Sequence, residues 1–135
     1  MMSTTDNKQR MQEIFAALAQ GDSRPFLEAM ADDFRWVLPG RTAWSRTYEG
    51  KEAVRKELFA PLFAQFADQY TSHARRIIAE GEHVVVEAQG QVTTRKGAAY
   101  NNTYCYIFRL RDGQMREVTE YMDTQLLAAV LDDPA

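Results

Sequence analysis

The stretch that decides the fold runs from Tyr100 to Asp123 and reads YNNTYCYIFRLRDGQMREVTEYMD. Its residues follow the period of two that strands show, and many are aromatic or β-branched. Only Arg111-Asp112-Gly113 breaks the pattern. An Asp-Gly pair between two alternating runs is a strong hairpin signal. The stretch therefore predicts two long antiparallel strands joined by a tight turn.

Glu120 is the most informative residue of this hairpin. It stands among aromatic and apolar strand residues in the run Glu120-Tyr121-Met122-Asp123. A carboxylate in such surroundings costs free energy unless it has a partner or a task. If Glu120 points inward, it marks a pocket with a proton-transfer group. If it points outward, it is an ordinary surface glutamate.

The direction in which Glu120 points depends on the turn, because a one-residue slip reverses every side chain. A two-residue Asp112-Gly113 turn pairs Arg111 with Gln114, and Glu120 then shares a face with Cys105. We favour a three-residue loop, with glycine in the left-handed position of a bulged turn. That loop pairs Leu110 with Gln114 and sets Glu120 in the most aromatic face of the chain, opposite Tyr104 and beside Asn102, Tyr106 and Phe108, with Met122 opposite Asn102.

The sequence before the hairpin is helical first and changes its period near Tyr70. Apolar residues at helical spacing predict a helix from the caps at Ser3–Thr5 to Gly21, a shorter one from Ser23 to Asp33, and a third from Gly50 to Phe66. Pro61 should kink or split the third helix. A strand over Phe34–Leu38, four strands over residues 70–79, 83–95, 100–111 and 114–123, and a last helical turn over 125–131 complete the pattern.

This order predicts an α+β domain with three N-terminal helices packed on one curved antiparallel sheet. The length of 135 residues predicts one domain over residues 1–135. A net charge of −3 gives no basic field for nucleic acid, and no window is long enough to cross a membrane. Cys105 is the only cysteine, which excludes an internal disulfide and favours a cytoplasmic location. The two histidines and one cysteine are too widely spaced for a metal site, and no cofactor motif is present.

Four further residues are candidates for a role at the site or in the structure around it. Trp36 should line the pocket, and His73 should do so because it alternates with apolar neighbours. Trp44 lies in the polar loop over residues 41–50, where it could form a lid or a partner contact. Asp123 stands at a strand end and should cap the final helical turn or pair with an arginine.

A family resemblance rests on Asn102-x-Tyr104, Asp112-Gly113 and the run from Glu120 to Thr124, with earlier agreement at Gly21-Asp22, Ala31-Asp32-Asp33, Trp36 and Gly50. The chain resembles the SnoaL-like proteins of the nuclear transport factor 2-like superfamily, often labelled ketosteroid-isomerase-related. The resemblance implies a sheet wrapped around three helices, with an apolar pocket in a cone, and dimers through the outer sheet face. Polyketide cyclases, steroid isomerases and limonene-type epoxide hydrolases share this cone.

The resemblance carries one active-site position over to this chain. Glu120 falls where the epoxide hydrolases place their catalytic aspartate. The steroid isomerase residues do not carry over, since Ile14, Leu38 and Tyr106 stand at the positions of that mechanism's tyrosine, aspartate base and oxyanion aspartate.

Two functions are compatible with these features. In the first, the protein is an enzyme with acid–base chemistry at Glu120, acting on an apolar cyclic or polyketide-like small molecule. Its pocket is then lined by Trp36, Asn102, Tyr104, Tyr106, Met122 and His73. In the second, the same cone is a non-catalytic ligand-binding or dimerisation module. A homodimer is expected in either case, through a sheet face that carries Val85, Cys105 and Ile107.

Overall fold

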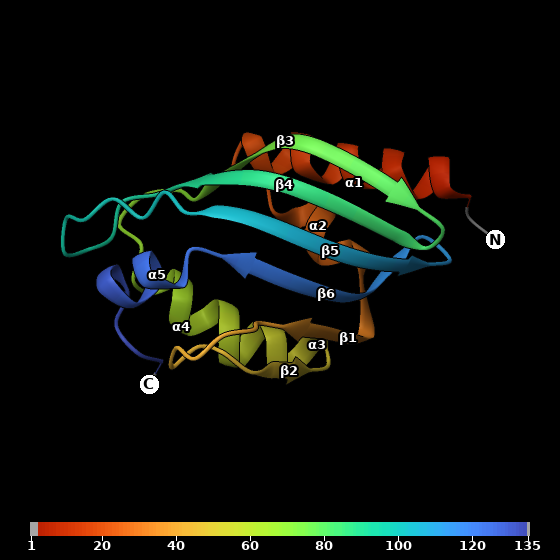
Figure 1. Ribbon diagram of the computed structural model, residues 1–135. Helices are drawn as coiled ribbons and strands as arrows, with labels where there is room; N and C mark the ends of the chain where they lie inside the picture. Colours follow the sequence, from red (N-terminus) through yellow and green to blue (C-terminus); the bar gives the residue numbers. More distant parts are fainter. Residues whose placement is uncertain (1–2, 135) are drawn as a thin grey trace.

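The computed structural model describes residues 3–134, with helices first and the long strands after them (Figure 1). The helices are α1 (Thr4–Ala19), α2 (Arg24–Ala29), α3 (Lys51–Ala53), the π-helix η1 (Val54–Phe59), α4 (Ala60–Phe63) and α5 (Thr124–Val130). The strands are β1 (Met30–Val37), β2 (Thr47–Glu49), β3 (Thr71–Glu80), β4 (His83–Gln91), β5 (Thr103–Arg111) and β6 (Gln114–Met122).

The six strands form one sheet in the order β2-β1-β6-β5-β4-β3. The sheet is curved and does not close, and helices pack against it, which confirms the predicted α+β class. One pairing departs from the antiparallel expectation, because β1 runs parallel to β6. Only strands joined by a tight turn are bound to be antiparallel, and most of the chain separates these two.

Helix α1 begins and packs as its sequence predicts. Ser3 forms a capping box with Asp6, in which each side chain accepts a hydrogen bond from the other's backbone N–H, both at 3.1 Å. Its apolar stripe, including Met11, Ile14 and Phe15, is buried in the core. Gly21 follows the helix with a φ of 78°, a conformation that favours glycine.

Pro61 shapes the third helix without ending it. The helix passes from α3 through the six residues of η1 into α4, and Pro61 stands near the start of α4. At the end of η1, Ala60 N–H donates to the carbonyl of Arg55, five residues back. Because Pro61 has no N–H of its own, the regular ladder fails here and a wider turn takes its place. The expected split is thus an α–π–α change within one continuous helix.

The hairpin between β5 and β6 corrects the predicted turn. Asp112 and Gly113 both have positive φ, 53° and 76°, and form a two-residue turn that pairs Arg111 with Gln114. The favoured three-residue loop was therefore wrong. A bulge then leaves Arg116 as an extra residue, since Leu110 pairs with Met115 but Arg109 pairs with Glu117.

The bulge restores the orientation that the turn alone would have reversed. After it, Glu120 lies opposite Tyr106 rather than Tyr104, and Met122 lies opposite Tyr104 rather than Asn102. Both pairings are displaced by two residues from the expected ones, and a displacement of two keeps every side chain on its face. Glu120 therefore points into the core side of the sheet, as expected, for a different reason.

Two further boundaries differ from the sequence prediction. Strand β1 begins at Met30, so the second helix ends earlier than Asp33. The loop over residues 41–50 contains the short strand β2, whose Tyr48 pairs with Trp36. Three residues are too few for a periodic signal, and only pairing with β1 makes them a strand. No helix among residues 3–134 combines the length and the apolar character that a membrane crossing requires.

Candidate functional site

A cavity of about 480 Å³ lies between the inner face of the sheet and the helices. This volume is within the range of small-molecule sites in proteins. Most of its lining is apolar or aromatic, and the exposed part of the lining marks a mouth formed by Ser23, Arg55, Ala60, Phe63 and Gln69. Side chains of the sheet and of the helices both contribute to this lining.

Glu120 is the buried carboxyl group of this cavity. It is 7% exposed and lines the cavity from β6. The Trp36 indole Nε1 donates a hydrogen bond to Glu120 Oε1 at 3.1 Å across the β1–β6 pairing. Strand β1 thus supplies the partner, 84 positions away in the sequence. The Trp36 bond occupies Oε1 alone, and the Glu120 side chain lines the cavity.

Burial raises the pKa of Glu120 to near neutral pH. Loss of solvation raises the pKa of Glu120 from 4.5 to about 7, although hydrogen bonds from the side chains of Trp36 and Tyr106 act in the opposite direction. A carboxyl group with such a pKa exists in both forms near pH 7. It can therefore donate or accept a proton without a large free-energy cost in either direction.

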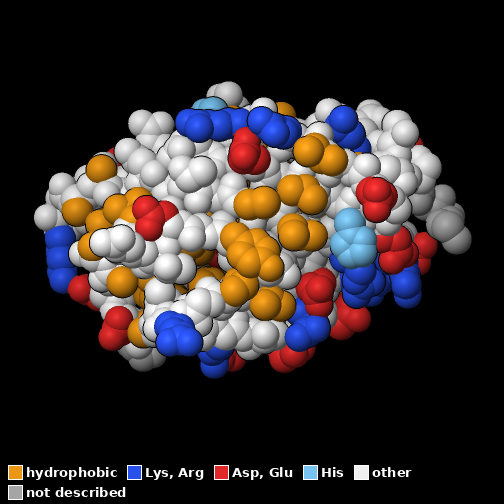
Figure 2. Space-filling view, viewed as in Figure 1, with side chains coloured by type: hydrophobic (Ala, Val, Ile, Leu, Met, Phe, Trp, Pro, Cys, Tyr) orange, Lys and Arg blue, Asp and Glu red, His pale blue; other side chains and the backbone are white. Residues whose placement is uncertain are grey.

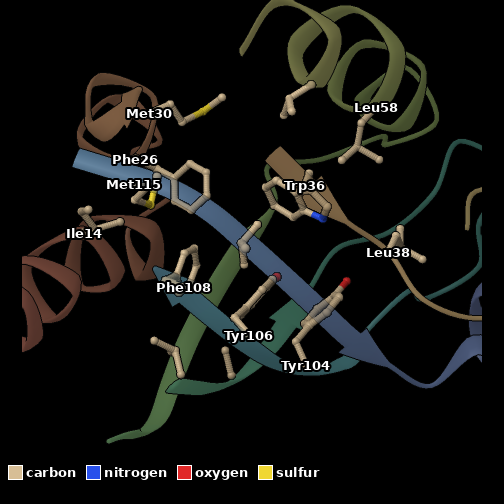
Figure 3. Close-up of a cluster of buried hydrophobic side chains, with 14 of the residues drawn as sticks. Ile14, Phe26, Met30, Trp36, Leu38, Leu58, Tyr104, Tyr106, Phe108 and Met115 are labelled. Atoms are coloured by element: carbon tan, nitrogen blue, oxygen red, sulfur yellow. The ribbon is translucent and has the colours of Figure 1, made fainter. Parts of the chain in front are cut away.

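Tyrosine hydroxyls share the cavity wall with Glu120. Tyr104 and Tyr106 stack with ring centroids 5.3 Å apart, and their hydroxyl groups point away from β5 toward Trp36 and Leu38 (Figure 3). Burial is the main cause that raises the pKa of both phenols well above the usual value. Both are therefore neutral hydrogen-bond donors near pH 7 and not alternative bases.

The structure places four of the predicted pocket residues around Glu120. Trp36, Tyr104, Tyr106 and Met122 all line the cavity. Asn102 is fully buried but does not line it. Its amide Nδ2 donates to the Tyr100 hydroxyl and to the Asp123 carbonyl, both at 3.1 Å, and its Oδ1 accepts from Asp123 N–H at 3.2 Å. Asn102 thus holds the ends of the hairpin together, a structural role.

His73 is not a pocket residue, which corrects the sequence prediction. It is exposed and pairs with Gln89 on the outer face of the sheet. Its neighbour Ser72 points inward and lines the cavity instead. Alternation with apolar neighbours indicated a strand correctly but did not indicate which set of residues faces the core.

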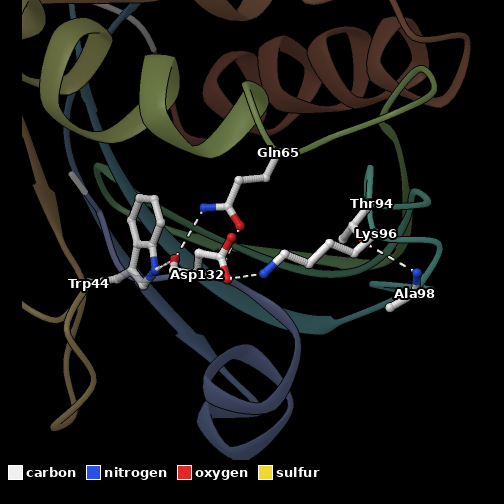
Figure 4. A network of polar contacts seen from close by, with 6 residues as sticks. All are labelled: Trp44, Gln65, Thr94, Lys96, Ala98 and Asp132. Carbon is white, nitrogen blue, oxygen red and sulfur yellow. Dashed lines mark hydrogen bonds and ion pairs between the residues drawn. The ribbon is translucent and has the colours of Figure 1, made fainter.

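The position of Trp44 in a polar loop had suggested a lid or a partner contact, but the side chain is part of the cavity wall instead. It is 1% exposed and lines the cavity. Its indole Nε1 donates to the Asp132 carbonyl at 3.1 Å, which Gln65 Nε2 also contacts (Figure 4). Lys96 pairs with the Asp132 carboxylate at 2.6 Å. This cluster fixes the segment after α5, and Leu127 of α5 and Leu131 of that segment form part of the cavity wall.

Asp123 caps α5, one of the two roles predicted for it. Its carboxylate accepts a hydrogen bond from Leu126 N–H at 3.1 Å. This bond satisfies a free donor of the first turn. The residue is outside the cavity lining, so its function is local.

Several lining residues were missed by sequence reasoning. Phe59 and Phe63 come from the π-to-α part of the third helix, Tyr70 comes just before β3, and Ser72 lies at the start of β3. The long apolar face of the third helix was recognised, but which residues of it face a cavity depends on the π-turn. Ser72 could have been found from its spacing, because residues two apart in a strand, such as Tyr70 and Ser72, point to the same face of the sheet.

The ionisable groups of the site limit its chemistry. Among described lining residues, Glu120 is the one carboxylate and Arg55 the one Lys or Arg. Arg55 is 55% exposed at the mouth, 3.7 Å from Glu52. Within residues 3–134, no three His, Cys, Asp or Glu side chains lie close enough together to hold a metal ion. The arrangement can move one proton at Glu120, with Tyr106 and Trp36 as donors beside it.

The chain belongs to the SnoaL-like domain family, which its residues 11–118 match. No curated protein matches it. A protein from Jannaschia sp. CCS1 described as a SnoaL-like polyketide cyclase has a similar structure, with a TM-score of 0.75 and 20% identity over 96% of this chain and 95% of that one. TerC, crystallised with polyporic acid, has a TM-score of 0.76 and 22% identity over 92% and 96%. An LEH-like epoxide hydrolase from M. tuberculosis has a TM-score of 0.70 and 19% identity over 90% and 86%.

Proposed function

We propose that this SnoaL-like protein is an enzyme that uses Glu120 for acid–base chemistry on an apolar cyclic or polyketide-like small molecule. The observation that carries the proposal is the position of Glu120, buried in an open cavity with one oxygen bonded to Trp36 and a pKa of about 7. An acid or base is most effective when its pKa is near the working pH. The reaction is of the cyclase, isomerase or hydrolase type.

Steroid isomerisation by the carboxylate-base mechanism is not part of this proposal. Leu38 lines the cavity at the position where that base is expected, and Ile14 is packed in the core away from the lining. Neither side chain can transfer a proton. The similarity to a protein described as a polyketide cyclase and to an epoxide hydrolase supports a ring-bearing substrate.

A non-catalytic binding module is the second candidate. A narrow or filled cone would favour it, and so would a Glu120 that serves only to bind Trp36. The volume of about 480 Å³ favours the first candidate over a filled cone.

Ligand entry can be tested with the chain's own tryptophans. Trp36 and Trp44 are the only two, and both line the cavity. We expect diphenylmethane, an uncharged two-ring hydrocarbon, to shift the tryptophan emission of the wild type saturably. Leu58→Phe, which adds volume to the cavity wall, should weaken this binding. Ile78→Phe on the outer sheet face is the control and should not. A signal that does not saturate, or that Leu58→Phe leaves unchanged, contradicts a ligand-sized cavity.

We also propose that the protein is a homodimer through the outer face of the sheet. Apolar side chains gather on that face (Figure 2). Ile78 and Tyr121 are 53% and 49% exposed, and the half-buried Val85, Cys105 and Ile107 connect them through the strand pairings. An exposed apolar patch of this kind is typical of an interaction site.

A charge introduced into this patch should abolish the dimer. We expect Tyr121→Lys to sediment as a monomer at tens of micromolar, where the wild type is a dimer, because a lysine buried at the interface loses its solvation. Phe63→Ser, at the cavity mouth, removes an equally exposed ring and should leave the dimer intact. A monomeric wild type contradicts the dimer, and a dimer that survives Tyr121→Lys places the interface elsewhere.

A further inference from the structure

Ser72 is a buried hydroxyl without a partner. It is 2% exposed and lines the cavity at the start of β3. Its Oγ makes no hydrogen bond with any described residue. Buried polar groups are nearly always hydrogen-bonded, because an unsatisfied one costs free energy. An exception that faces a cavity is a position where a ligand atom can supply the missing bond.

Gly90 creates the space beside Ser72. The two residues pair directly across β3 and β4. A Cβ atom at position 90 would lie 2.8 Å from the Tyr70 hydroxyl oxygen and 3.0 Å from a ring carbon of Tyr104. A glycine within a strand often marks such a close approach. The Tyr70 hydroxyl is thus seated on the backbone of β4, next to Ser72 on the same wall.

We propose that Ser72 and Tyr70, seated over Gly90, form an oxygen-binding subsite of the cavity that takes an uncharged carbonyl or hydroxyl oxygen of the ligand. This inference rests on the proposed function, since it concerns the same cavity. The subsite gives the cavity a second polar contact for a ligand, in addition to Glu120. The preferred ligand is therefore a ring compound with two oxygen functions, one held at Ser72 and Tyr70 and the other presented to Glu120.

The electrostatics of this wall favour a neutral acceptor. Burial raises the pKa of Tyr70 to about 12, although the Tyr104 hydroxyl opposes the shift. Tyr70 therefore stays protonated and can donate. Arg55, the one Lys or Arg among the described lining residues, is largely exposed at the mouth. A carboxylate bound at Ser72 would have no cation beside it, whereas a carbonyl oxygen needs only donors.

Binding of two matched probes tests the subsite. Benzophenone and diphenylmethane have the same two rings and differ in one carbonyl oxygen. We expect wild-type protein to bind benzophenone about fivefold more tightly in calorimetric titrations, the value of one neutral hydrogen bond. Ser72→Ala should reduce this ratio toward one while leaving diphenylmethane affinity equal or higher. Gly90→Ala, which displaces Tyr70, should reduce the ratio as well.

Thr71→Val is the matched control. Thr71 is the neighbour of Ser72 on β3 and lies outside the lining of the cavity. Its substitution should leave both affinities unchanged. Equal binding of the two probes to wild type, or a ratio that Ser72→Ala preserves, overturns the subsite and leaves the proposed function standing. If neither probe binds, the subsite and the proposed ring-binding cavity both fail. Thermal unfolding checks folding, since Ser72→Ala removes an unsatisfied group and should not lower Tm.

Discussion

Glu120→Gln is expected to lower turnover by a factor on the order of 10²–10⁴, the usual contribution of a positioned acid or base. Glutamine keeps the shape of the side chain and an oxygen that can accept the Trp36 indole hydrogen bond. It cannot exchange a proton near pH 7. The measurement is the rate of wild type and variant on an apolar cyclic substrate found by screening, with KM compared to separate binding from chemistry.

The same substitution should stabilise the protein above pH 7. The folded-state pKa of Glu120 is raised from 4.5 to about 7, so its contribution to stability is fully present below 4.5 and is lost as pH rises through 7. At 1.36 kcal/mol per pKa unit, the ionised carboxylate costs the fold on the order of 3 kcal/mol. Urea unfolding should therefore show wild type and Glu120→Gln nearly equal in acid and the variant more stable above pH 7.

Glu117→Gln is the control for both effects. Glu117 lies on the same strand, pairs with Arg35 at 2.8 Å and is 31% exposed at its side chain. A surface ion pair contributes roughly 0–1 kcal/mol, so this variant should change neither activity nor the pH dependence of stability appreciably. If Glu120→Gln unfolds the protein at all pH values, Glu120 is a structural partner of Trp36. If turnover survives the change, the catalytic role is wrong.

Trp44→Ala should be the most destabilising single change in the cavity wall. Its side chain is 1% exposed, and removal of so large a group from a core costs about 3–5 kcal/mol. The variant also loses the hydrogen bond to the Asp132 carbonyl. Because that bond fixes the segment carrying Leu131, we expect weaker ligand binding as well as a lower urea midpoint.

Trp44→Phe separates packing from hydrogen bonding. It keeps most of the ring volume and removes the indole N–H, so we expect a loss of about 1 kcal/mol for the hydrogen bond, well below that of Trp44→Ala. The Tyr48 hydroxyl bonds the Trp44 backbone carbonyl at 2.8 Å, and this contact survives both substitutions. A loss below about 1 kcal/mol for Trp44→Ala would be inconsistent with a wall residue that organises the C-terminal segment.

The order of helices and strands follows from local patterns, which explains why most of it could be predicted. The capping box at Ser3 and the positive-φ glycines act over a few residues and can be read from sequence. The parallel pairing of β1 with β6 and the strand β2 cannot, because they depend on contacts across most of the chain. From the sequence, the effect of Pro61 could be predicted only as a kink or split of the third helix, and not as a π-helix before the proline.

The candidate site was harder to predict than the fold, because more of it depends on contacts between distant parts of the chain. The inward direction of Glu120 was expected from a three-residue loop, yet it arises from a two-residue turn followed by the bulge at Arg116. The partner Trp36 and the subsite at Ser72 come from strands that meet only in the folded sheet. His73 and Asn102 are residue types that are common in functional sites. In the folded sheet, however, His73 lies on the outer face, and Asn102 has a structural role in holding the hairpin ends together.

The most direct test of the account is the titration of the Glu120 side-chain carboxyl carbon by NMR, assigned by comparison with Glu120→Gln. We expect a midpoint at about pH 7, because burial in the cavity disfavours the charged form. A midpoint near the 4.5 of an ordinary glutamate would contradict it, since such a group is solvated and ionised throughout the neutral range and is not poised for proton transfer.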